Sequence, residues 1–162
     1  MSNTEPRNHW VVWLTFIIAM LLDQMSLPDT LAYGRPQFVM IVLIYWVLAL
    51  PERFSFFTAL CLGIIMDEMN DNVFGVYALA LVLQSYLVLL MYQRLRMFPA
   101  FQQSIVVIVV IFVGMFVIAT INLFLGEFNW DWRFFYPSIF SALVWPWAYL
   151  LLRSVRQKFQ VQ

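Results

Sequence analysis

The stretch Gly63-Ile64-Ile65-Met66-Asp67-Glu68-Met69-Asn70-Asp71-Asn72-Val73-Phe74-Gly75 interrupts a chain that is otherwise almost uniformly apolar. Three of the nine acidic residues fall within five positions, from Asp67 to Asp71, between two apolar runs. Because a carboxylate is costly next to hydrocarbon, it normally faces water, the protein interior or a partner. Gly63 and Gly75 flank this segment with small contact points and backbone freedom. The sequence therefore predicts membrane helices arranged around a polar break.

The composition indicates an all-α integral membrane protein. The 162 residues are 64% hydrophobic and only 11% charged, with a mean hydropathy of +0.83. A soluble domain carries roughly 25% charged residues, so this chain has too few to cover a water-facing surface. Nine Lys and Arg residues spread along the chain exclude a nucleic-acid-binding patch. We therefore predict one transmembrane domain over residues 1–162, without a soluble domain.

Six apolar runs define the predicted spans, at about 9–27, 36–50, 54–66, 74–92, 104–125 and 134–152. A spanning helix needs about 20 residues, and the second and third runs are shorter than that. The first run reaches this length only if Asp23 is tolerated near its end. Pro51 opens the polar turn between the second and third runs, which predicts a helical hairpin. The alternative is that run 54–66 only dips into the bilayer, which leaves five spans.

Basic residues favour six spans over five. With six spans and both termini on one side, that side carries seven basic residues and the other side carries two. The seven are Arg7, Arg53, Arg94, Arg96, Arg153, Arg156 and Lys158, and the two are Arg35 and Arg133. The positive-inside rule places the richer side in the cytoplasm. We therefore expect a multi-pass protein with both termini in the cytoplasm.

Tryptophans gather near the ends of the predicted spans. Trp and Tyr favour the membrane interface because one part of the ring can be buried while the other part stays wet. The tryptophans near these ends are Trp10, Trp13, Trp130, Trp132, Trp145 and Trp147. We therefore expect most of them to form an interfacial belt.

The acidic break has the spacing of a weak metal motif. Asp67 and Asp71 are four residues apart, so they share one face if the helix continues through both. Enzymes that hold a divalent cation in this way usually need a second acidic motif and nearby basic residues, and neither is present here. His9 and Cys61 are the only histidine and the only cysteine, which removes the usual zinc ligands. We predict no catalytic, cofactor or metal site, and a polar connector in which Asp67 is paired or capping.

Other residues suggest structural or docking roles. Pro36 suits the first position of a helix. Arg35, on the side where basic residues are rare, either pairs with an acid such as Asp67 or extends into lipid headgroups. Pro146 is expected to kink the last helix. Arg153 and Arg156, three positions apart on that helix, are either a headgroup anchor or a docking point for a cytoplasmic partner.

Several of these segments together resemble one family. They are Arg35-Pro36, Tyr45-Trp46 through Leu50-Pro51, Gly63-x-x-x-Asp67 with Gly75 eight residues on, Trp145-Pro146-Trp147, and Leu151-Leu152-Arg153-x-x-Arg156-Gln157. In this order they look like MreD, the bacterial rod shape-determining membrane protein, over nearly the whole chain. The family often has a Ser/Gly turn after the aspartate, where this chain has Asn70-Asp71-Asn72.

The resemblance implies a non-enzymatic member of the cell-elongation machinery in the bacterial inner membrane. It implies MreC as the direct partner. Through MreC it implies the MreB filament, the RodA glycosyltransferase and its transpeptidase, which together organise sidewall peptidoglycan synthesis. It also implies a fold similar to the six-helix substrate-binding subunits of energy-coupling-factor vitamin transporters. No cofactor is implied.

The leading hypothesis is therefore a membrane scaffold that binds MreC. Its expected partner surface is an apolar helix face that includes Gly63 and Asp67, together with the loops at 67–75 and 126–133. The first alternative is a membrane subunit that binds or transports a small molecule or a lipid. The second is a membrane enzyme that uses Asp67 and Asp71.

Overall fold

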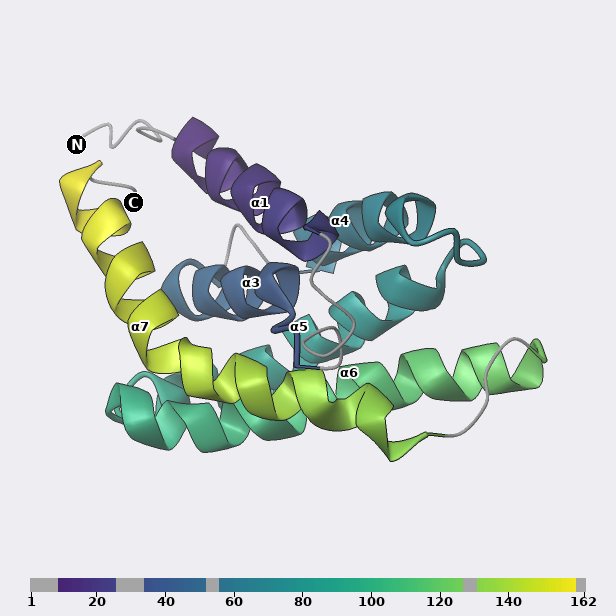
Figure 1. The fold of residues 1–162 in the computed structure, drawn as a ribbon. Helices are drawn as coiled ribbons and strands as arrows, with labels where there is room; N and C mark the ends of the chain where they lie inside the picture. The colour runs from purple at the N-terminus through teal and green to yellow at the C-terminus, as the bar shows by residue number, and fades with distance from the viewer. Residues whose placement is uncertain (1–8, 26–33, 52–55, 127–130, 160–162) are drawn as a thin grey trace.

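The computed structural model describes residues 9–25, 34–51, 56–126 and 131–159, and these residues form helices joined by turns, without a strand (Figure 1). The prediction of an all-α chain is therefore confirmed for this part of the protein. The helices are α1 (His9–Gln24), α3 (Phe38–Ala49), α4 (Phe56–Met69), α5 (Val76–Leu95), α6 (Ala100–Phe124) and α7 (Tyr136–Lys158), and the short 3-10 helix η1 (Trp132–Phe135) precedes α7.

Three of these helices are long and apolar enough to cross a membrane: α5, α6 and the η1–α7 segment. The apolar helices α1 and α3 have 16 and 12 residues, and α4 has 14. Six complete spans therefore remain a prediction. The boundaries also differ from those expected. Helix α4 continues past residue 66 to Met69, α6 begins at Ala100 directly after Pro99, and α7 continues past residue 152 to Lys158.

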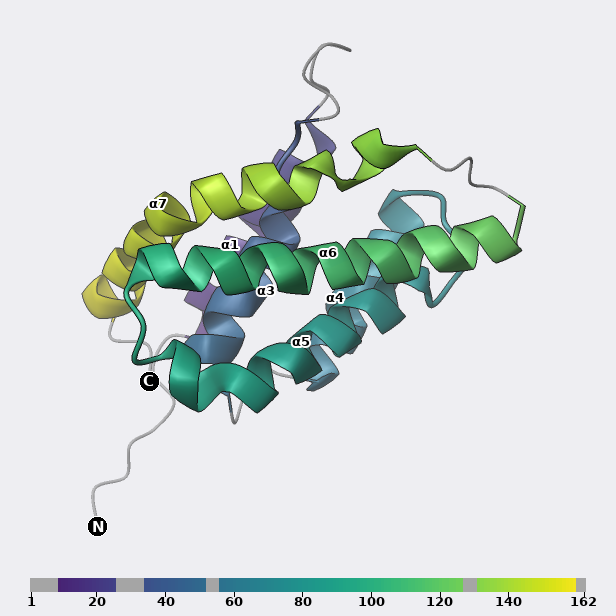
Figure 2. The same ribbon diagram turned by 90° about the horizontal axis from the view of Figure 1, so that it is seen from below.

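The helices alternate in direction, so the charges collect at two opposite ends (Figures 1 and 2). We call one the acidic end, because it holds every acidic residue in the described part of the chain: Asp23, Asp67, Glu68, Asp71 and Asp131. We call the other the basic end, and it holds Arg94, Arg96, Arg153, Arg156 and Lys158. Helix α1 begins and α7 finishes at the basic end, where the rings of Trp10 and Phe159 meet edge to face at 6.0 Å.

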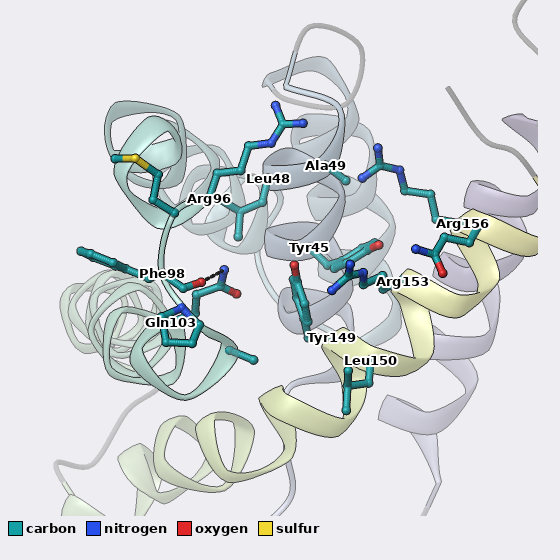
Figure 3. Close-up of a pocket in the computed structure, with 14 residues that line it drawn as sticks. Tyr45, Leu48, Ala49, Arg96, Phe98, Gln103, Tyr149, Leu150, Arg153 and Arg156 are labelled. Atoms are coloured by element: carbon teal, nitrogen blue, oxygen red, sulfur yellow. Dashed lines mark hydrogen bonds between the residues drawn. The ribbon is translucent and has the colours of Figure 1, made fainter.

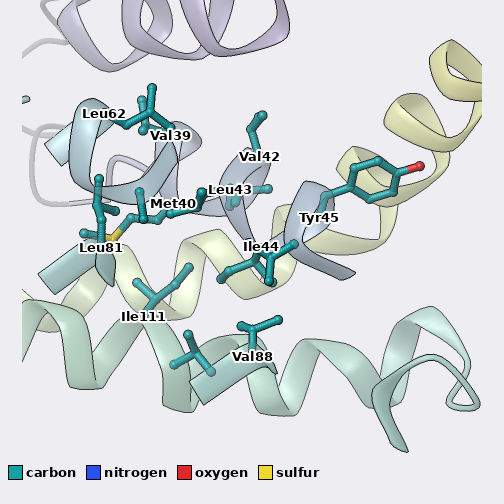
Figure 4. Close-up of a cluster of buried hydrophobic side chains, with 14 of the residues drawn as sticks. Val39, Met40, Val42, Leu43, Ile44, Tyr45, Leu62, Leu81, Val88 and Ile111 are labelled. Carbon is teal, nitrogen blue, oxygen red and sulfur yellow. The ribbon is translucent and has the colours of Figure 1, made fainter. Parts of the chain in front are cut away.

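Helix α3 lies at the centre of the bundle. Every side chain from Val39 to Leu48 is buried, and the helix packs against α1, α5, α6 and α7 (Figure 4). Its sequence is apolar all round, which is the pattern of a helix with neighbours on every side. The one indole in it, that of Trp46, donates a hydrogen bond to the Thr15 hydroxyl of α1 at 3.0 Å. A short helix can serve as the core here because its neighbours surround it and form the outer surface of the bundle.

Helices α4 and α5 form a close hairpin at the acidic end. Gly63 of α4 lies directly on the backbone of Ala78 in the first turn of α5. A Cβ atom added at Gly63 would overlap the Cα atom and the backbone nitrogen of Ala78. Backbone atoms cannot move aside as a flexible side chain can, so only glycine permits this approach.

One turn further along α4, Asp67 caps α5. Its side chain is fully buried, at 0% exposure. The two carboxylate oxygens accept hydrogen bonds from the backbone N–H groups of Gly75 (2.8 Å), Tyr77 (2.7 Å) and Ala78 (3.4 Å). The first turn of a helix has unpaired N–H donors and a partial positive charge, and a carboxylate satisfies both. Gly75 precedes the helix with φ of 102°, a left-handed conformation that favours glycine.

A second carboxylate does the same for the central helix. Asp23, in the last turn of α1, accepts hydrogen bonds from the backbone N–H groups of Phe38 at 2.9 Å and Val39 at 3.0 Å. These are the first two residues of α3. Arg35, which precedes α3, donates to the backbone carbonyl of Leu22 at 2.8 Å and so caps the C-terminal end of α1. Both helix pairs at the acidic end are thus joined by an aspartate of one helix bound to the start of the next.

Helix α7 bends along its length (Figure 1). Pro146 lies inside the helix, where it removes a backbone hydrogen bond and forces its ring against the preceding turn. The bend lets the first half of α7 follow α6 (Figure 2) while its last turns meet α3 at the basic end.

We predict that Gly63→Ala destabilises the protein by about 1–3 kcal/mol, because the added methyl group forces the two backbones apart. The matched control is Ile64→Ala, which removes an exposed side chain from the same turn of α4. Thermal unfolding of the purified protein in detergent measures both. An unfolding midpoint for Gly63→Ala as high as that of the control would contradict the close approach.

We predict that Asp67→Asn lowers the free energy of unfolding by about 2 kcal/mol, because the amide presents a donor to the N–H groups that the carboxylate now satisfies. Glu68→Gln makes the same change in charge on the adjacent, exposed residue and is expected to be nearly neutral. The same unfolding assay separates the two variants. Equal losses would mean that net charge, and not the cap, is what matters.

Candidate functional site

The loop between α4 and α5 presents an apolar tip beside two acids. After α4 the chain turns tightly: the backbone N–H of Asn72 donates to the carbonyl of Asp67 at 3.0 Å, and Asp71 adopts φ of 51°. Outside this turn, Phe74 is 69% exposed and Val73 is 47% exposed. We call residues 68–74 the tip loop. Because Asp67 and Gly63 hold it from inside, the loop is a fixed feature of the acidic end.

The acids of this loop do not form the pair that their spacing suggested. Helix α4 ends at Met69, so Asp71 lies in the turn and does not share a helical face with Asp67. Both carboxylate oxygens of Asp67 are already bound to backbone N–H groups. Among the residues that the structure describes, no group of three or more His, Cys, Asp or Glu side chains could hold a metal ion. The chemistry of Asp67 here is that of a helix cap.

A cavity of about 1040 Å³ lies at the basic end (Figure 3). The ends of α3 and α5, the turn into α6, and the last part of α7 form its walls. Its lining residues are Tyr45, Leu48, Ala49, Arg96, Met97, Phe98, Pro99, Ala100, Gln103, Tyr149, Leu150, Arg153, Arg156 and Gln157. Three arginines, two tyrosines and a row of apolar side chains thus share one hollow, which we call the basic cavity.

The floor of the basic cavity is well fixed. Tyr45 packs edge to face against Tyr149 with ring centroids 5.7 Å apart, and Arg156 lines the cavity beside them. In the wall, the amide of buried Gln103 donates to the carbonyls of Leu95 at 2.9 Å and Phe98 at 3.2 Å. These bonds tie the turn between α5 and α6 to the body of α6, so the cavity is held in shape by hydrogen bonds and ring packing.

The belt prediction is wrong for Trp145. This side chain is fully buried, and its indole N–H donates to the amide oxygen of Gln103 at 3.3 Å. A partner for the polar N–H inside the bundle removes the reason to stay at the interface. Trp147, two positions on, is 71% exposed, and Trp10, Trp13 and Trp132 are also exposed. Trp130 lies outside the described residues.

The structure divides the predicted residues into three groups. Gly63, Asp67 and Gly75 come together where α4 meets α5. Tyr45, Arg153 and Arg156 meet in the basic cavity. The remainder lie apart from both sites: Arg35 and Pro36 before α3, Trp46 in the core, Pro51 after α3, and Trp145, Pro146 and Trp147 along α7.

The sequence analysis did not identify four residues that matter: Asp23, Arg96, Gln103 and Tyr149. Asp23 carried a signal, since it is an acid at the end of an apolar run, as Asp67 is. Arg96 appeared only as one of several cytoplasmic charges. Its convergence with Arg153 depends on how the helices pack, and sequence spacing does not encode that.

Comparisons with known proteins give one consistent result. The family model described as rod shape-determining protein MreD matches residues 5–155. The Rod shape-determining protein MreD of Haemophilus influenzae is 30% identical over 153 residues, which cover 92% of this chain and 94% of that protein. No solved structure matches, so the similarity to transporter substrate-binding subunits remains a prediction. On the strength of the match along nearly its whole length, the chain belongs to the MreD family of rod shape-determining proteins.

Proposed function

We propose that this chain is a non-enzymatic membrane scaffold of the bacterial cell-elongation machinery and that it binds MreC. Through MreC it connects to the MreB filament, to RodA and to the partner transpeptidase, and so helps to organise sidewall peptidoglycan synthesis. The observation that carries the proposal is the exposed apolar tip loop, positioned by hydrogen bonds to Asp67, in a protein of a shape-determining family. A hydrophobic tip held by a buried cap is suited to protein contact.

The separation of charge supports an orientation in the inner membrane. Five of the basic residues in the described ranges lie at one end, together with the start of α1 and the finish of α7. The positive-inside rule assigns such an end to the cytoplasm. On this assignment both termini are cytoplasmic, and the acidic end with the tip loop faces the opposite side.

We propose the tip loop as the partner surface, without Gly63 or Asp67. Those two residues are buried against α5, so they reach a partner only by positioning the loop. Residues 127–130 of the other expected loop, 126–133, lie outside the described residues. Phe74 and Val73 provide apolar contact, and Glu68 and Asp71 provide flanking negative charge. An aromatic side chain surrounded by polar groups is a common anchor in protein interfaces.

The chemistry of the acidic residues also supports a non-enzymatic role. A general acid, a general base or a metal ligand needs free oxygens that face a substrate. The most buried carboxylate, that of Asp67, instead uses both oxygens on backbone N–H groups, and Asp23 does the same at the start of α3.

The second candidate, a ligand-binding or transport subunit, is favoured by one observation, the basic cavity. It has the size of a small-molecule site, and polar groups converge on it from several helices. It lies at the end opposite to the tip loop, so a ligand there is compatible with scaffolding.

We predict that replacing Val73 and Phe74 together with serine reduces capture of MreC by at least about tenfold, because the loop then loses its apolar anchor. Both proteins are co-expressed in a bacterial membrane and extracted in mild detergent, and MreC is quantified after affinity purification of the tagged chain. The double variant is expected to keep its thermal stability, since both side chains are exposed.

The matched control is Phe101→Ser, which changes a phenylalanine that is 79% exposed at the first turn of α6, near the basic end. It is expected to capture MreC as the unchanged chain does. Full capture by the Val73/Phe74 variant would reject the tip loop as the surface. No capture by the well-folded unchanged chain would reject the scaffold proposal and favour the ligand-binding candidate.

A further inference from the structure

The basic cavity concentrates positive charge that no described acid neutralises. Arg96 enters from the end of α5, while Arg153 and Arg156 enter from the last turns of α7 (Figure 3). Every acidic side chain in the described ranges lies at the opposite end of the bundle. Bringing three like charges from two helices to one hollow costs free energy, and an anion in the hollow would relieve that cost.

The polar groups of the cavity match an oxyanion with several acceptor oxygens. A guanidinium presents parallel N–H donors that pair with phosphate in a two-pronged geometry. Arg153 and Arg156 are three positions apart and thus lie on one face of α7, beside Tyr45 and Tyr149. The two tyrosine hydroxyls add further possible donors. This set fits a phosphate group better than a carboxylate, because it offers more donors than a carboxylate can use.

The remaining walls indicate that the phosphate is attached to an apolar group. Leu48, Met97, Phe98 and Leu150 line the same hollow, and its volume of about 1040 Å³ is far larger than one phosphate needs. The cavity also lies at the ends of α5 and α7, which are long and apolar enough to cross a membrane, so we expect it at the boundary between hydrocarbon and water. A molecule with an anionic head and an apolar tail satisfies both kinds of wall at once.

The cavity is organised before any ligand arrives. Gln103 ties the α5–α6 turn through two carbonyls and also accepts a hydrogen bond from Trp145 of α7. That contact links the α6 side of the hollow to α7. Because these bonds already fix the helix ends, a ligand has less ordering entropy to overcome.

We propose that the basic cavity is a binding site for the phosphate group of an anionic amphiphile, with Arg153 and Arg156 as its principal ligands and Arg96 opposite them. The site lies at the other end of the protein from the tip loop and does not depend on the proposed contact with MreC.

The test is a thermal-shift titration of the full chain, purified in detergent, with short-chain dihexanoyl phosphatidylglycerol. Glycerophosphoglycerol, which carries the same phosphodiester without the tails, is titrated in parallel. Phosphatidylglycerol is expected to raise the unfolding midpoint in a saturable way, and glycerophosphoglycerol is expected to act only at much higher concentration. Equal action of the two compounds would overturn the amphiphile and identify the ligand as a soluble phosphate.

Two variants locate the site. Arg153→Gln combined with Arg156→Gln is expected to weaken the response to phosphatidylglycerol by about tenfold or more, because it removes charged donors to the phosphate. The matched control, Arg94→Gln, removes an exposed arginine at the same end that does not line the cavity, and it is expected to respond as the unchanged chain does. An equally weakened response in Arg94→Gln would mean that the lipid is attracted to the whole basic end, and it would overturn the proposed site.

Leu150→Trp provides a second check that leaves the charges in place. Leu150 lines the cavity and is 56% exposed, so an indole at this position narrows the hollow beside Arg153 without disturbing the core. The variant is expected to unfold at the usual temperature without ligand and to respond more weakly to phosphatidylglycerol. An undiminished response would overturn the cavity as the place of binding. Capture of MreC, measured on the same variants, is expected to stay unchanged.

Discussion

The buried carboxylate of Asp67 is the interaction on which the acidic end of this protein depends. A carboxylate at 0% exposure between two helices is tolerated only when strong donors surround it, and Gly75 with the first turn of α5 supplies three N–H groups. To reach them, α4 must approach α5 so closely that no side chain fits at Gly63. The cap and the glycine therefore require each other. Together they fix where the tip loop leaves the bundle and which of its side chains face outward.

The repeated use of one device explains how short helices hold together. Asp23 joins α1 to α3 as Asp67 joins α4 to α5, in each case with a carboxylate on the N–H groups at the start of the following helix. The acids are thereby used to build the fold at one end. At the other end Arg96, Arg153 and Arg156 line the basic cavity, and the acids of the described residues all lie at the acidic end. The two ends of the bundle are chemically different, and we assign them different tasks.

Much of the fold follows from the sequence, because apolar run length and charge placement are properties of single segments. The all-helical class, the approximate limits of the helices and the importance of Gly63, Asp67 and Gly75 could be predicted in this way. Properties that arise from the packing of helices against one another could not be predicted in this way. Trp145 is buried because Gln103, in another helix, accepts its N–H. The basic cavity exists because the bend in α7 brings Arg153 opposite Arg96, which lie far apart in the chain. The role of Asp23 could have been predicted as that of Asp67 was, because each is an acid at the end of an apolar run.

The central claim is our proposal that this member of a shape-determining family acts as a scaffold through a tip loop that a buried cap holds in place. The most direct measurement places a photo-crosslinking amino acid at Phe74, or at Phe101, which is also largely exposed, in living cells that make both this chain and MreC. We expect a crosslink to MreC from position 74 and none from position 101. A crosslink from position 101 alone would contradict the account, because it would move the contact to the basic end.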